Sequence, residues 1–421
     1  MGHITSKSFL KLQKRLDMSA QGAPESEALF KILEILFTKD EAEKVSLLPI
    51  KPFSVETAAK RWKTSNESAK KTLNDLADKG ILFDIENKGK QTYTMAPTMA
   101  GFFEFSLMRT DGKFDRKVLS ELYYQYINVE KDFVDQTMDQ RTSMARTLVH
   151  ETSVDEKSFI LDYEKASEVV DTASCHAVGT CYCRHKMEHV GKACDAPQNV
   201  CLTFNSAART LTKHGIAKKI SRKESQKILD ECVDYGLVQI GDNTQKGVGW
   251  ICNCCGCCCE AILAYKQIGD YERLSSSFFA EFDSKKCTGC GLCAKKCPVE
   301  AIQIKNKKAK IDLSKCLGCG VCHRFCNFKA IKIKRRGKTA FVPKDTFERC
   351  LLNAIEKGKL QNYIFDNYDL WTNELLRHLL GILLKLSPAK FLVANEQLRS
   401  RFLNALKKAG NTKIFKKLYK K

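Results

Sequence analysis

The chain has 421 residues, a formal net charge of +21 and 21 cysteines, and 43% of its residues are apolar. This composition excludes a disordered chain and is typical of a globular protein with about two to four domains. No stretch reaches the roughly 18 apolar residues that span a bilayer, and residues 1–19 lack the apolar core of a secretory signal. We therefore expect a cytoplasmic protein, whose many cysteines bind metal rather than form disulfides.

Residues 1–110 contain no cysteine, and their pattern predicts helices followed by a β-hairpin. Apolar spacing predicts helices over residues 25–37, 38–48, 54–62 and 64–79, of which the second opens with a capping box at Thr38 and Glu41 and the fourth is capped from Thr64. Alternating residues then predict strands over 81–85 and 91–95, joined by a turn at 87–89. Three of these helices followed by the hairpin resemble the winged-helix domain of many small bacterial repressors.

This resemblance implies DNA binding, with Lys63, Lys70 and Lys71 on or beside the recognition helix. A docking or scaffold module is built from the same elements. The helix lacks the density of Arg, Asn and Gln that reads base edges, and acidic residues are spread through 25–43 and 75–86. We therefore favour the docking module over DNA as a partner.

Residues 111–160 predict a helical bridge to a cysteine-rich middle domain at 161–275. The middle domain holds twelve cysteines, most of them in the segments CHAVGTCYCRHKMEHVGKACDAPQNVC (from residue 175) and WICNCCGCCC (from residue 250). Neither spacing fits a zinc finger, a rubredoxin or a ferredoxin. Six cysteines within residues 252–259 exceed the needs of one mononuclear site, and thiolates select iron–sulfur clusters, zinc or cuprous ions.

Two helices predicted over 206–214 and 221–235, the second ended by Gly236, and a short strand over 237–240 separate the two cysteine segments. Such a spacer folds both segments onto one composite site, which holds an additional iron–sulfur cluster or zinc. The predicted ligands are Cys181, Cys183, Cys194, Cys201, Cys252, Cys254, Cys255, Cys257, Cys258 and Cys259.

Three further side chains are expected beside this site. Arg184 is predicted to be a charge partner of a reduced, more negative cluster. His185 and His189 stand four residues apart and share a helical face, as metal ligands or, in the interpretation we favour, as hydrogen-bonding residues. Cys175 and Cys232 lie at helix-like positions and are predicted to be packed thiols.

Residues 280–340 contain the most specific motif of the chain, a C-x2-C-x2-C-x3-C spacing that occurs twice. This pattern resembles the bacterial two-cluster ferredoxin, in which three neighbouring thiolates and one remote thiolate bind each [4Fe-4S] cluster. The resemblance implies two [4Fe-4S] clusters. Their ligands are Cys287, Cys290, Cys293 and Cys326 for cluster I, and Cys316, Cys319, Cys322 and Cys297 for cluster II.

One residue departs from the ferredoxin pattern. Pro298 follows the first remote cysteine, as the family has it, but Asn327 follows the second. The departure leaves the ligands intact and puts the loop shape around cluster I in question. The stretches 301–305 and 330–334 alternate as short strands, as the resemblance implies.

The CxCRH and CNCCxCCC segments beside a ferredoxin module are similar to a family of bacterial iron–sulfur proteins. The resemblance covers most of residues 1–330 and implies iron–sulfur chemistry without a particular reaction. The predicted fold class is a mostly helical, multi-domain α+β protein. It has a winged-helix-like N-terminal domain, a cysteine-rich helical middle domain and a ferredoxin-like 2[4Fe-4S] domain.

Residues 341–421 predict a basic helical tail. From Lys329 onward, 22 lysines and arginines stand against 7 acidic residues, a surplus of 15 in a chain whose net charge is +21. Helices are predicted over 369–386 and 387–410. A basic amphipathic surface attracts an acidic redox partner protein, or makes peripheral contact with an acidic membrane.

The sequence favours a cytosolic electron-transfer protein that relays single electrons between two [4Fe-4S] clusters and a further metal cluster in the middle domain. Two alternatives stay open: a redox-sensing winged-helix regulator that binds DNA, and an oxidoreductase that acts on a small substrate at the middle cluster. Neither G-x-G-x-x-G after a strand nor G-x4-G-K-[ST] occurs, so no flavin or ATP site is indicated.

Overall fold

The computed structural model describes residues 6–87, 89–154, 158–337, 341–364 and 377. The chain divides into two compact units, Met1–Asn353 and Ala354–Lys421. The second unit contains the described helix α17 (Leu360–Ile364), while the predicted tail helices at 369–386 and 387–410 lie outside the described residues, apart from Arg377. Within the described ranges, no helix has the length and apolar character needed to cross a membrane.

The first unit begins with helices and a hairpin. In chain order they are α1 (Lys7–Asp17), α2 (Glu27–Leu36), α3 (Lys39–Ser46), α4 (Val55–Trp62), α5 (Asn66–Asp78), β1 (Leu82–Asn87) and β2 (Lys90–Met95). Thr38 and Glu41 form the predicted capping box of α3, whereas α5 is capped by Ser65 and not by Thr64. The element order agrees with the expected one, and the winged-helix class stays a prediction.

The residues after the hairpin continue the same apolar core. The elements are η1 (Thr98–Phe102), α6 (Phe103–Met108), α7 (Arg116–Tyr123), η2 (Tyr124–Val129) and α8 (Asp132–Thr137). Phe103 contacts Tyr123, Tyr126 and Phe133 with ring centroids 4.8–6.1 Å apart, in one cluster with the leucines of α2 and α5. This core anchors α6, which lines the site described below.

The middle of the chain is built on a six-stranded antiparallel sheet, which corrects the prediction of a helical middle domain. Its strands, in the spatial order β3-β7-β8-β5-β4-β6, are β3 (Ala145–Leu148), β4 (His176–Gly179), β5 (Cys201–Phe204), β6 (Lys218–Ile220), β7 (Val238–Asp242) and β8 (Trp250–Cys254). Only β7 was expected. The other strands have three to five residues, too short for a clear alternation of apolar and polar residues.

Five helices accompany this sheet: α9 (Ala166–Thr172), α10 (Tyr182–His189), α11 (Asn205–Lys213), α12 (Arg222–Tyr235) and α13 (Glu260–Ile268). Gly236 ends α12 with a φ of 93°, a left-handed conformation that suits glycine. The short turns η3 (Glu151–Ser153), η4 (Asp162–Glu164) and η5 (Tyr271–Leu274) connect neighbouring elements. Helices α10 and α13 both begin beside the sheet, and this placement brings the cysteines together.

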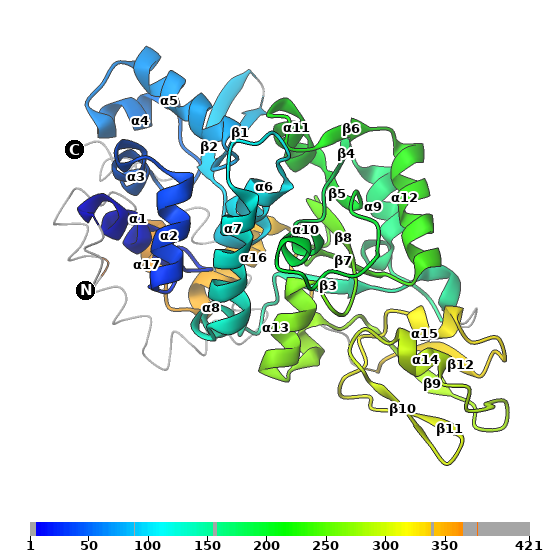
Figure 1. Cartoon of the computed structure of the whole chain (residues 1–421). Helices are drawn as coiled ribbons and strands as arrows, with labels where there is room; N and C mark the ends of the chain where they lie inside the picture. Colours follow the sequence, from blue (N-terminus) through cyan, green and yellow to red (C-terminus); the bar gives the residue numbers. More distant parts are fainter. Residues whose placement is uncertain (1–5, 88, 155–157, 338–340, 365–376, 378–421) are drawn as a thin grey trace. The chain divides into compact units, whose positions relative to one another are not determined.

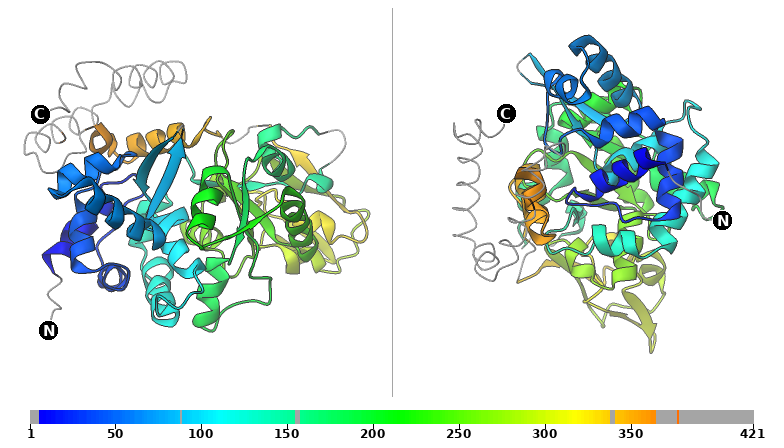
Figure 2. Two further views of the ribbon diagram at one scale, coloured as in Figure 1. Left: turned by 90° about the horizontal axis from the view of Figure 1, so that it is seen from above. Right: turned by 90° about the vertical axis from the view of Figure 1, so that its left-hand side faces the viewer.

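The ferredoxin-like segment (residues 278–335) follows η5. It contains β9 (Phe278–Phe282), α14 (Leu292–Lys296), β10 (Ile302–Lys305), β11 (Lys308–Ile311), α15 (Val321–Arg324) and β12 (Ile331–Arg335), and is followed by α16 (Thr346–Glu356). The pairs β10–β11 and β9–β12 form two separate antiparallel ribbons. Within the first unit, the green sheet lies between the blue N-terminal helices and this yellow segment (Figures 1 and 2).

The N-terminal hairpin docks against helix α11. Asp84 of β1 is buried, forms an ion pair with Lys213, and accepts a hydrogen bond from His214 Nε2 at 2.9 Å. The hydroxyl of Thr210 donates to the carbonyl of Asp84 at 3.0 Å. Burial alone would lower the pKa of His214, but hydrogen bonds to Asp84 and Asp78 raise it above its ordinary value. The hairpin is therefore a contact surface between two parts of the chain.

Candidate metal centres

The structure gathers the eight ferredoxin cysteines into two sets. One cavity is lined by Cys287, Cys290, Cys293 and Cys326, and a second by Cys297, Cys316, Cys319 and Cys322. Each set combines three neighbouring cysteines with the remote cysteine of the other motif. These are the sets that the ferredoxin resemblance implies, and the assignment of cluster ligands stays a proposal.

Backbone N–H groups point at the sulfurs of these sets. The amide of Gly289 donates to Cys287 Sγ, that of Ala301 to Cys297 Sγ and that of Ala330 to Cys326 Sγ, each at 3.3 Å. Such bonds stabilise thiolates and raise the reduction potential of a bound cluster. The donor set therefore suits [4Fe-4S] clusters.

Asn327 does not change the loop after its cysteine. The amides of Ala301 and Ala330 bond the sulfur four residues earlier in the same way, and Glu300 and Lys329 both have positive φ, 55° and 47°. The two motifs thus close with the same backbone shape, with proline in one and asparagine in the other.

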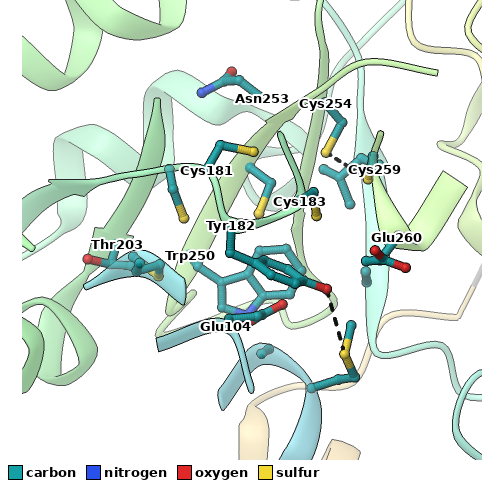
Figure 3. Close-up of a pocket in the computed structure, with 18 of the residues that line it drawn as sticks. Glu104, Cys181, Tyr182, Cys183, Thr203, Trp250, Asn253, Cys254, Cys259 and Glu260 are labelled. Carbon is teal, nitrogen blue, oxygen red and sulfur yellow. Dashed lines mark hydrogen bonds between the residues drawn. The ribbon is translucent and has the colours of Figure 1, made fainter. Parts of the chain in front are cut away.

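A further site, which we call the chamber, is lined by seven cysteines of the middle domain. They are Cys181 and Cys183 at the start of α10, Cys201 at the start of β5, Cys252 and Cys254 on β8, Cys255 directly after β8, and Cys259 at the start of α13. Cys252 and Cys254 share one face of β8 because side chains alternate along a strand. The cavity has a volume of about 120 Å³. Figure 3 shows the sulfurs of Cys181, Cys183, Cys254 and Cys259 around it.

The chamber favours the thiolate form of Cys181, Cys252 and Cys259, and the pKa values of their hydrogen-bonding partners Cys183, Cys201 and Cys254 are raised well above the ordinary value. The sulfurs of Cys254 and Cys259 lie 3.1 Å apart. Hydrogen bonds from Cys183 and Cys254 hold the pKa of Cys259 well below its ordinary value, and the backbone N–H of Ile262 adds to this effect. Hydrogen bonds from Cys201 and Cys254 likewise hold the pKa of Cys252 well below its ordinary value. Thiolates are the form that binds metal.

The chamber also has a wall without cysteine, which no sequence motif indicates. Glu104 of α6, Tyr182 and Trp250 line it, as Figure 3 shows. Burial and the nearby Cys252 thiolate hold the pKa of Glu104 well above its ordinary value. The hydroxyl of Tyr182 lies 3.8 Å from Met99 Sδ. Glu104 lies in an apolar helix far from any cysteine in sequence, so only the fold reveals it.

The remaining three cysteines of the predicted composite site form a compact group with Cys255. Cys194, Cys255, Cys257 and Cys258, which we call the four-thiol group, have sulfurs that all lie within 4.8 Å of one another. The cysteines of the expected composite site thus form two groups that meet at Cys255. They meet within the turn between β8 and α13, where Cys254, Cys255 and Cys259 line the chamber and Cys255, Cys257 and Cys258 lie near Cys194.

Arg184 lies between the two groups. It is 1% exposed, its Nη1 donates to the carbonyl of Asn253 at 3.1 Å, and the same nitrogen lies 3.9 Å from Cys255 Sγ. Its Nε and Nη2 atoms have no hydrogen-bond partner in the described part of the chain. Burial would lower the pKa of Arg184, but the thiolates of Cys181 and Cys255 raise it. A buried cation with unused donors requires negative charge nearby.

The two histidines lie on another side of α10. His185 Nδ1 is 2.7 Å from the carbonyl of Leu107, and its Nε2 is 3.2 Å from His189 Nε2. Neither residue is among those that line the chamber. The packed cysteines lie apart from the chamber lining too: Cys175 packs against Ala177 and Ala208, and Cys232 is buried in α12.

The middle domain contacts the ferredoxin-like segment directly at the cysteines. A Cβ atom on Gly256 would lie 2.2 Å from the carbonyl oxygen of Pro298, the residue after Cys297. Lys266 Nζ donates to the carbonyl of Gly256 at 3.2 Å and pairs with Glu300 at 2.9 Å. One apolar cluster includes Cys254 and Cys259 of the chamber as well as Cys319 and Cys297.

Residues 280–327 match the model of a protein family described as a 4Fe-4S dicluster domain. No curated protein and no solved structure matches the chain. The chain therefore carries an iron–sulfur, ferredoxin-like domain. Together with the cysteine group of the middle domain, the match supports an iron–sulfur electron-transfer role.

Proposed function

We propose that this chain relays single electrons between a redox partner, two [4Fe-4S] clusters in the ferredoxin-like segment and a further iron–sulfur cluster in the chamber. The ferredoxin cysteines hold clusters I and II in the two sets given above. Such clusters supply one-electron chemistry, and their potentials depend on hydrogen bonds to the sulfurs and on burial. The residues of the chain position the clusters and set their reduction potentials.

The contact between Gly256 and Pro298 carries this proposal. It brings the turn that ends the chamber against the residue next to Cys297, with no side chain between the two backbones. The apolar cluster that contains cysteines of both sites excludes water from the path between them. Cluster II is therefore the neighbour of the chamber, and cluster I is the more remote member of the relay.

The surface near cluster I suits the redox partner. Cys290 is exposed, and so are Phe328 (48%) and Ile304 (37%), which line the same cavity. Lys285 and Lys286 are exposed beside Cys287. An apolar contact surrounded by lysines fits a small acidic redox protein, which charge attraction would guide to this end. Its reaction with the chain should slow as ionic strength rises.

A second candidate function, oxidoreductase activity on a small substrate, is favoured by the cysteine-free wall of the chamber. Glu104 and Tyr182 line the same cavity as the chamber cysteines, so a proton donor and an electron source share one apolar space. His185 and His189, the titratable side chains expected beside this site, do not line the chamber. We propose Glu104 in their place.

The DNA-binding alternative gains less support. Lys63, Lys70 and Lys71 are exposed, as a recognition helix requires. However, Asp84 of the hairpin already forms an ion pair with Lys213 and a hydrogen bond with His214. A hairpin held in this way suits the docking module that the sequence favoured.

The first test measures iron and acid-labile sulfide on anaerobically purified protein, with EPR spectra of the dithionite-reduced form. The proposal expects about twelve irons per chain, whereas clusters I and II alone would give about eight. The variant Cys252→Ser should lower the iron content to about eight per chain and leave the EPR signals of the ferredoxin clusters unchanged. The control variant Cys175→Ala should change neither the iron content nor the EPR signals. An iron content of about eight in the unchanged protein would refute the cluster in the chamber.

A further inference from the structure

The four-thiol group has the dimensions of a site for a single metal ion. The sulfurs of Cys257 and Cys258 lie 3.6 Å apart, and those of Cys258 and Cys194 lie 3.9 Å apart. A tetrahedron with metal–sulfur bonds of about 2.3 Å has sulfur–sulfur edges of about 3.8 Å. The arrangement is therefore already close to that of a tetrahedral ion.

A cubane cluster does not fit these distances. Its four thiolates bind four different irons at the corners of a cube, so their sulfurs lie farther apart than the edges of a single-metal tetrahedron. Within the described ranges, the four-thiol group is the one set of three or more histidine, cysteine or acidic ligands whose donor atoms come this close. The chamber and the ferredoxin cavities spread their sulfurs around a wider space.

We propose that Cys194, Cys255, Cys257 and Cys258 bind one zinc ion, at a site that adjoins the chamber at Cys255 and leaves the other six chamber cysteines to the iron–sulfur cluster. Four thiolates fill a tetrahedral coordination shell and leave no open position, which is the donor set of a structural zinc site. Four thiolates around a divalent ion leave two negative charges. The buried guanidinium of Arg184, 3.9 Å from Cys255 Sγ and with unused donors, offsets part of that charge.

The position of this site gives it a structural purpose. Three of its ligands surround Gly256, whose backbone contacts Pro298. A metal ion that joins them to Cys194 fixes the shape of the turn at the point where the middle domain meets the ferredoxin-like segment. Zinc does not change its oxidation state, so this site holds the relay in place and carries no electron.

The test measures zinc and iron on the full chain, purified anaerobically, by inductively coupled plasma mass spectrometry and zinc-edge X-ray absorption. We expect about one zinc per chain, bound by four sulfurs at about 2.3 Å. The variant Cys257→Ser, at the exposed ligand, should lose zinc to a chelator more than tenfold faster while its iron content stays unchanged. Cys175→Ala, a buried thiol outside both groups, is the matched control.

Two results would overturn the zinc site. One is a protein without zinc in which Cys257→Ser removes iron and sulfide together, since the group would then hold an iron–sulfur cluster. The other is a single iron in place of zinc. Neither result bears on the cluster proposed for the chamber. That cluster is detected by its own EPR signal, which Cys252→Ser removes. The two proposals can therefore fail independently.

Discussion

The ferredoxin-like segment and the middle domain assemble cysteine sites in opposite ways. In the former, three cysteines of each set lie within seven residues, as in Cys287–Cys293, and a tight backbone places them. In the latter, the seven cysteines of the chamber come from two strands, the turn after one of them and the starts of two helices, spread over residues 181–259. A site made by neighbouring residues can be recognised from their spacing in the sequence. A site assembled by a sheet can be recognised only in the folded structure.

The largest expected effect comes from breaking the local site. Replacing Cys290 by serine removes one ligand of cluster I, so we expect roughly four fewer irons per chain and electron flow from a partner near background. The chamber cluster should still form, because its ligands lie elsewhere in the chain, and dithionite should still produce its EPR signal. Loss of the chamber signal in this variant would show that the two sites assemble together.

The next effect tests the junction between the two regions. In Gly256→Ala, the new Cβ meets the Pro298 carbonyl at 2.2 Å, so the backbones must separate. We expect a loss of stability of about 1–3 kcal/mol and slower electron transfer from cluster II to the chamber, with iron content unchanged. Rapid-mixing kinetics measures the transfer. Gly249→Ala is the control, because its Cβ meets only Asp242 Oδ2, at 3.7 Å; equal rates in the two variants would contradict the junction.

A third prediction concerns the charge inside the middle domain. Arg184→Met leaves the thiolates around it uncompensated, and we expect metal affinity to fall about 10–100-fold and the reduction potential of the chamber cluster to become more negative. Metal release to a chelator and potentiometric EPR measure these effects. Arg184→Lys retains the charge but not the planar geometry of the guanidinium, so a full rescue by lysine would assign the effect to charge alone.

The docked hairpin gives a pH-dependent effect. The pKa of His214 is raised in the folded chain, so its contribution is complete below about pH 6.5 and is lost as the pH rises through the raised value. Burial would raise the pKa of Asp84, but hydrogen bonds from His214 and Lys213 lower it, so its contribution is lost as the pH falls through the lowered value. We expect greatest stability between about pH 4 and pH 6.5.

Thermal unfolding from about pH 2 to about pH 9 measures both limbs. His214→Gln should flatten the decline above about pH 6.5 and leave the acid limb, which belongs to Asp84 and other carboxylates. An unchanged decline at high pH in the variant would show that a group other than His214 is responsible.

The smallest effect is expected at Asn327. Because the loops after Cys297 and Cys326 share their hydrogen bonds and their positive φ values, Asn327→Pro should change stability by less than about 0.5 kcal/mol and leave the iron content unchanged. Chemical denaturation and iron analysis check this. A marked loss of iron would mean that the two loops are not equivalent.

The elements that the sequence predicted well have strong local signals. The capping box at Thr38 and Glu41, the left-handed Gly236 and the repeated ferredoxin spacing are each determined by a few neighbouring residues. The strand β8 shows the opposite case: in Trp250–Cys254 the residues that alternate are cysteines and an asparagine, so no apolar periodicity marks it. Without that strand, the two faces of the turn after it could not be separated, and one composite site was expected.

The buried ion pair between Lys186 and Glu260 lies among the residues that set the chamber. Lys186 is on α10 and Glu260 is on α13, with side chains 0% and 2% exposed, and Asn128 donates to Glu260 Oε2 at 2.8 Å. Removing one partner leaves a buried charge unpaired, at a cost of about 3–5 kcal/mol, while replacing both with apolar residues is close to neutral. In mutational terms the two positions are coupled, so each restricts the substitutions that the other tolerates, and viable sequences change them together.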